Sequence, residues 1–78
     1  MDVTTLTTIA KLLGIKLTNA EEGTEVYEAW KDRVEQANEY DLDINHARNL
    51  RSRQAQEDVK EFTEKRDAAI SEANRYAI

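Results

Sequence analysis

The chain has 78 residues and a formal net charge of −5, and it contains neither cysteine nor proline. This length suits one small domain near the lower limit for independent folding, and without cysteine neither disulfides nor thiolate metal sites can support it. The acidic balance argues against general binding to the nucleic-acid phosphate backbone. The chain has no apolar run long enough to span a bilayer and no basic leader at its start, so we expect a cytoplasmic or virion protein without a signal peptide.

The first predicted element is a short helix that begins near Asp2 or Thr4, either of which suits the N-cap position. Gly14 follows directly and is predicted to close the helix in the left-handed conformation. Helical spacing predicts an apolar face composed of Leu6, Ile9, Leu12 and Leu13.

A central amphipathic helix is predicted over residues 24–40, with Trp30 as the anchor of the core because an indole buries more area than any other side chain here. The helix begins at either Asn19 or Thr24, and the sequence leaves both open. Its predicted apolar face holds Val26, Trp30, Ala37 and Tyr40, widened by Tyr27 and Val34.

Residues 40–45 are rich in Asp and Asn, which are poor in helix interiors and good at caps. We predict a short turn here, with Asp43 capping a third helix. The alternative is one unbroken helix over residues 24–76, because Leu42 and Ile44 continue the apolar spacing across the junction.

The last part of the chain is predicted to be a long helix with a heptad-like seam. The seam steps alternately by four and three residues and consists of Ala55, Val59, Phe62, Arg66, Ala69, Ala73 and Tyr76. Because three of its positions are alanine, each layer of the seam buries little area. The predicted helix is also longer than the central helix over residues 24–40, which therefore cannot cover all of it. The predicted fold is therefore all-α, a single domain over residues 1–78 in which residues 45–78 project or pack against a partner.

Charged residues gather in an acidic run and in a basic cluster that follows it. The acidic run over residues 21–43 is typical of a solvated helix face, and also suits a mimic of nucleic-acid phosphates. A basic cluster contains His46, Arg48, Arg51 and Arg53. It fits either a solvated face or a contact with phosphate or with an acidic neighbouring surface.

The sequence carries no pattern typical of catalysis or of cofactor binding. His46 is the only histidine and has no second ligand at metal-binding spacing. We therefore predict no enzymatic activity, no cofactor, no metal site and no small-molecule substrate.

Residues 6–15 resemble the first helix and turn of a helix-turn-helix DNA reader, with Ala10 and Gly14 at its small-residue and turn positions. Residues 19–23 depart from that motif, because they offer no base-reading helix and place Gly23 where an apolar residue belongs. A short core helix with a glycine cap is the better interpretation.

Residues 4–40 are predicted to form a helix, a glycine, a short polar link with acids and a long amphipathic helix. This order resembles the opening of tailed-phage head–tail connector (head-completion) proteins. The resemblance implies a small all-α protein that assembles into rings and has no catalytic residues. Residues 41–78 depart from that family's later part.

The predicted function is that of a structural assembly or adaptor protein that acts through helix–helix packing, with copies of itself or with a protein partner. A phage neck component is one specific form of this function. The alternative is a small regulatory or inhibitory binding protein, either an acidic helical inhibitor or a degenerate helix-turn-helix.

Overall fold

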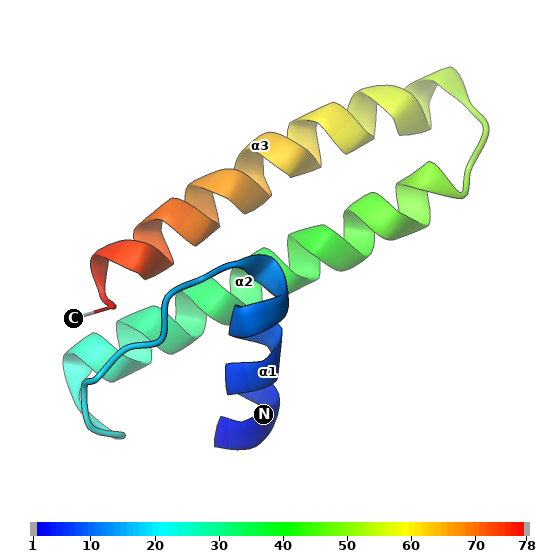
Figure 1. Ribbon diagram of the computed structural model, residues 1–78. Coiled ribbons are helices and arrows are strands. Elements are labelled where there is room, and N and C mark those ends of the chain that lie inside the picture. The colour runs from blue at the N-terminus through cyan, green and yellow to red at the C-terminus, as the bar shows by residue number, and fades with distance from the viewer. Residues whose placement is uncertain (1, 78) are drawn as a thin grey trace.

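The computed structural model describes residues 2–77, which form three α-helices and no strand (Figure 1). They are α1 (Val3–Leu13), α2 (Glu25–Arg48) and α3 (Arg53–Arg75). The predicted all-α fold is confirmed. Within residues 2–77, no helix combines the length and the hydropathy needed to cross a bilayer.

Helix α1 begins and ends as its sequence predicts. The Asp2 Oδ1 atom accepts a hydrogen bond from the Thr5 backbone N–H at 2.7 Å. Gly14 has φ +73°, and its N–H donates to the Lys11 carbonyl at 3.2 Å. The next N–H, that of Ile15, reaches back to the Ala10 carbonyl at 2.8 Å, which completes a glycine-based C-cap.

The segment between α1 and α2 is extended and is tied to the far end of the chain. The Lys16 N–H donates to Asn74 Oδ1 at 2.8 Å, and the Thr18 hydroxyl donates to the Tyr76 carbonyl at 2.9 Å. Thr24 then caps α2 by accepting from the Tyr27 N–H at 3.3 Å. Of the two starts left open by the sequence, the helix uses Thr24.

Helix α2 runs through residues 40–45 without a turn, so the predicted cap at Asp43 is wrong. The chain turns instead at residues 49–52, where Asn49 ends α2 and the Ser52 hydroxyl caps α3 by accepting from the Ala55 N–H at 3.1 Å. Burial explains the difference, because Ile44 is 0% exposed and is held in the helical interface.

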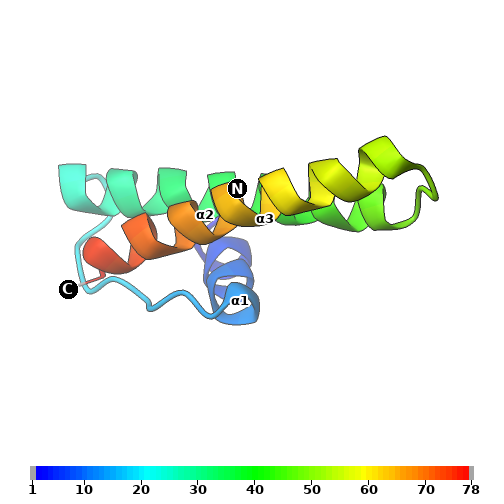
Figure 2. The ribbon, with the colours of Figure 1, turned by 90° about the horizontal axis from the view of Figure 1, so that it is seen from above.

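Helix α3 folds back along α2, and the two form an antiparallel hairpin (Figure 1). Helix α3, part of the segment over residues 45–78 that was expected to project or to pack against a partner, thus lies beside α2 of its own chain. The molecule measures 44 × 20 × 17 Å. Helix α1 crosses one face of the hairpin, as the view from above shows (Figure 2). We call the end of the hairpin at residues 46–56 the tip.

The core lies where α1, the extended segment, α2 and the C-terminal part of α3 meet. Trp30 is 3% exposed, and its Nε1–H donates to the Lys16 carbonyl at 3.0 Å. Tyr27 is buried, whereas the predicted core residues Val26 and Tyr40 are only half-buried. Leu12, expected on the apolar face of α1, is 81% exposed. The buried core consists of Leu6, Ala10, Ile15, Tyr27, Trp30, Val34, Ala37, Ala69 and Ala73.

Candidate interaction surfaces

The seam predicted on the last helix faces α2 of the same chain. Ala55, Ala69 and Ala73 are buried, while Val59, Phe62, Arg66 and Tyr76 are half-buried. The Phe62 ring stacks on Tyr40 of α2, with ring centroids 6.4 Å apart. The small alanine side chains that make the seam thin also let α3 lie close to α2.

Two ion pairs join the helices of the hairpin. The Arg66 Nη1 atom lies 2.9 Å from Asp41 Oδ1, and both side chains are largely shielded from solvent, with 23% and 29% exposed. Arg33 of α2 pairs with Glu72 of α3. In the sequence, Arg66 interrupts the apolar seam of the last helix, and Arg33 and Asp41 lie among the apolar positions of the central one. Such interruptions on two helices were the available signal that the helices pair with each other.

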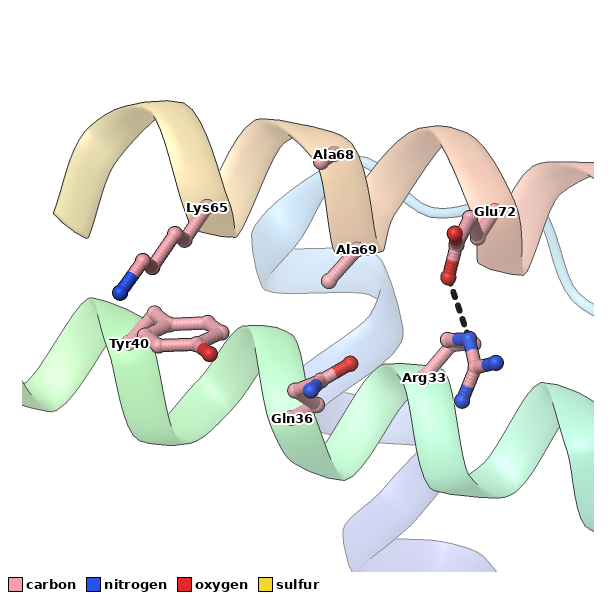
Figure 3. A pocket seen from close by; sticks show the side chains of 7 residues that line it. All are labelled: Arg33, Gln36, Tyr40, Lys65, Ala68, Ala69 and Glu72. Atoms are coloured by element: carbon pink, nitrogen blue, oxygen red, sulfur yellow. Dashed lines mark ion pairs between the residues drawn. The ribbon is translucent and has the colours of Figure 1, made fainter. Parts of the chain in front are cut away.

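One shallow groove, with a volume of about 340 Å³, runs between α2 and α3 near the core (Figure 3). Its lining is Arg33, Gln36, Tyr40, Lys65, Ala68, Ala69 and Glu72. Arg33 is paired with Glu72 across it. The Lys65 Nζ atom lies 3.0 Å from Glu61 Oε1, and the hydrogen bond between them raises the pKa of Lys65. The charges of this groove are already neutralised within the chain, which leaves little to attract a charged ligand.

A second groove, of about 460 Å³, lies at the tip of the hairpin and is more apolar. It is lined by Ala47, Arg48, Leu50, Arg51, Gln56 and Val59. The turn builds it, because the N–H of Asn49 bonds to the His46 carbonyl at 3.1 Å and that of Leu50 to the Ala47 carbonyl at 3.0 Å. Leu50 is left 49% exposed at the edge of the groove. We call this site the tip groove.

The rim of the tip groove is basic. Arg48 and Arg51 line it, Arg53 follows at the start of α3, and all three are exposed. Among residues 2–77 none of the three forms an ion pair, and residues 44–56 contain no acid. Of the basic cluster that the sequence singled out, Arg48 and Arg51 thus line the groove, and Leu50 and Val59 join them as apolar lining residues. The sequence pattern did not indicate the groove, because the turn that forms it was predicted elsewhere.

The outward face of α2 is acidic. Its carboxylates recur at helical spacing on the side away from the core and are those of Glu28, Asp32, Glu35 and Glu39. None of them forms an ion pair with another described residue. Leu42, 59% exposed, lies one turn beyond Glu39. We call Glu35, Glu39 and Leu42 the acidic leucine face.

His46 is exposed and stands at the tip, and in residues 2–77 no group of histidine and carboxylate side chains is arranged to hold a metal ion. Comparison of the chain with protein families, with characterised proteins and with solved structures gave no match.

Proposed function

We propose that this chain is a non-enzymatic assembly or adaptor protein that works by packing its helical hairpin against another protein surface. The observation that carries the proposal is the tip groove: a largely apolar surface lined also by the unpaired Arg48 and Arg51, at the end of the hairpin away from the Trp30 core. An exposed apolar patch rimmed by charged residues is typical of a protein–protein interaction site.

The packing inside the hairpin narrows the choice of surfaces that a partner can bind. The seam residues of α3 and the ion pairs Arg33–Glu72 and Arg66–Asp41 are used inside the chain, to hold the hairpin. Two surfaces of the hairpin that remain free for a partner are the tip groove and the outward face of α2. Both surfaces are carried by the hairpin of α2 and α3.

A phage neck or connector component is the specific form of this function that the resemblance of residues 4–40 suggests. In this chain those residues form α1, the Gly14 cap, the extended segment and the first part of α2. The second candidate is an inhibitory binding protein, and the observation in its favour is the unpaired row of carboxylates on α2. Such a row suits a basic acceptor surface.

Light scattering of the purified chain at physiological salt distinguishes these functions. The assembly function predicts a discrete species larger than the 9.0 kDa monomer. A monomer that forms a one-to-one complex with a basic acceptor protein would favour the inhibitor. A monomer that captures no protein at all would contradict both.

A further inference from the structure

The molecule carries two exposed surfaces of opposite charge that do not contact each other within one chain. The tip groove presents Arg48 and Arg51 beside apolar lining residues. The acidic leucine face presents the exposed Glu39 and the half-buried Glu35 beside an exposed Leu42. We propose that the tip groove of one copy binds the acidic leucine face of a second copy. This inference rests on the assembly function proposed above and names its partner.

The chemistry of the two surfaces matches group by group. Leu42 is an aliphatic side chain that is 59% exposed, and the groove offers Leu50 and Val59 as aliphatic neighbours. Glu39 stands one turn from Leu42 and Glu35 one turn further, so all three side chains lie on one face of α2. A leucine seated in the groove brings those carboxylates to the arginines of the rim, where charge-assisted pairs form.

The alternatives fit less well. Nucleic acid would bring a long array of phosphates toward a chain whose net charge is −5, and the basic surface is confined to the tip. In a second copy, by contrast, only the acidic leucine face would lie against the tip. This partner is always present, because every copy of the chain carries that face. The contact also removes Leu42 and Leu50 from water, the two exposed leucines of the hairpin among the described residues.

The two surfaces are different, so the contact is heterologous. Each copy uses its tip on one neighbour and its α2 face on the next, and the assembly either closes into a ring or continues as a filament. Attraction between charges at an exposed rim is screened by salt, so the assembly dissociates as ionic strength rises.

Charge reversal tests the contact from both sides. The tip variant carries Arg48→Glu and Arg51→Glu, and the face variant carries Glu35→Arg and Glu39→Arg. Each variant alone places like charges against like, so each is expected to associate at least tenfold more weakly than the unmodified chain. An equal mixture of the two restores opposite charges at both contacts and is expected to restore assembly.

Sedimentation velocity from micromolar to submillimolar concentration provides the measurement, with circular dichroism to confirm that each variant is helical. Two controls reproduce the changes in net charge elsewhere on α3, where the residues are exposed: Lys60→Glu with Arg75→Glu, and Glu57→Arg with Glu64→Arg. Both controls are expected to associate like the unmodified chain.

The other outcomes overturn the proposal in distinguishable ways. If the unmodified chain assembles and the two variants assemble equally well, the interface lies elsewhere and the assembly function stands without this contact. If each variant fails alone and the mixture also fails, the acidic leucine face is not the occupant of the groove. If the unmodified chain remains a monomer throughout, the self-assembly proposal is wrong, and the tip is left to an acidic partner of another kind.

Discussion

Trp30 shows how one side chain joins the core to the extended segment. Its ring is 3% exposed in the core and lies 5.9 Å from that of Tyr27, measured between centroids. Its Nε1–H also holds the Lys16 carbonyl of the extended segment, at 3.0 Å. The indole therefore fills the core and also fixes a backbone carbonyl of the extended segment.

Trp30→Ala is expected to lower the free energy of unfolding by about 3 to 5 kcal/mol, because it removes the largest side chain in the core and a hydrogen bond. Urea denaturation followed by circular dichroism measures the loss. Leu50→Ala is the control and should cost less than about 1 kcal/mol, since Leu50 is 49% exposed. A Trp30→Ala chain that unfolds at the same urea concentration as the unmodified chain would place the core elsewhere.

The Arg66–Asp41 pair is expected to contribute to hairpin stability more than a surface ion pair does, since its side chains are only 23% and 29% exposed. Arg66→Leu alone or Asp41→Leu alone should cost about 1 to 2 kcal/mol, between the values for surface and buried pairs, by leaving one charge unpaired. The double variant should lose less than the sum of the single losses, as measured by urea denaturation in a double-mutant cycle. Strict additivity would mean that the two charges do not interact.

Asp2 predicts a pH effect at the start of α1. The hydrogen bond from the Thr5 N–H lowers the pKa of Asp2 below its ordinary value of 3.8. A carboxylate with a lowered folded-state pKa stabilises the fold above its unfolded pKa, and this contribution disappears as the pH falls through the folded pKa. Asp2→Asn keeps an N-cap that does not titrate, so the melting temperature of this variant should fall less on acidification than that of the unmodified chain. Equal acid sensitivity would show that other groups account for it.

At the scale of the elements, α1 was predictable because its signals are local. A cap at Asp2 and a glycine at the C-terminal end define a helix without reference to the rest of the chain. The boundary between α2 and α3 was not predictable in this way. Asp43 and Asn45 weaken a helix by propensity, yet both are exposed while Ile44 between them is fully buried. Tertiary packing overrides propensity at this position.

The position of the turn also decides what covers the seam. A turn at residues 40–45 would leave a short central helix that could not cover a longer third one, which is why the sequence suggested an external partner. The turn at residues 49–52 gives helices of 24 and 23 residues, so each covers the other. Asn49 and Ser52 were the overlooked signal, since both residue types favour helix ends.

Phe62→Asp tests whether the hairpin interface is internal. Phe62 is half-buried and stacks on Tyr40, so a carboxylate there loses the stack and faces an apolar surface. We expect a loss of about 2 to 4 kcal/mol in the free energy of unfolding, against less than about 1.5 kcal/mol for Phe62→Leu. Thermal melts by circular dichroism compare the two. If Phe62→Asp keeps its stability and changes only the oligomeric state, the seam serves a partner, as its spacing alone suggested.

At the scale of the whole molecule, stability and interaction are separated along the hairpin. The core cluster lies where α1, the extended segment and the C-terminal part of α3 pack on α2. The buried residues nearest the tip are Ile44, Ala47 and Ala55. A chain of this size has about 5 to 10 kcal/mol of stability at most, so the sparsely packed tip is the part that opens first. Contact with a second copy would stabilise that part most.

We propose that the tip and the neighbouring part of α2, not the core, form the contact surface with a second copy. Hydrogen exchange followed by mass spectrometry at rising protein concentration tests this contact. Peptides covering residues 35–51 are expected to exchange more slowly as the concentration rises, while those around Trp30 exchange at an unchanged rate. The contact is ruled out if exchange at the tip is independent of concentration, or if concentration-dependent protection is confined to the core peptides.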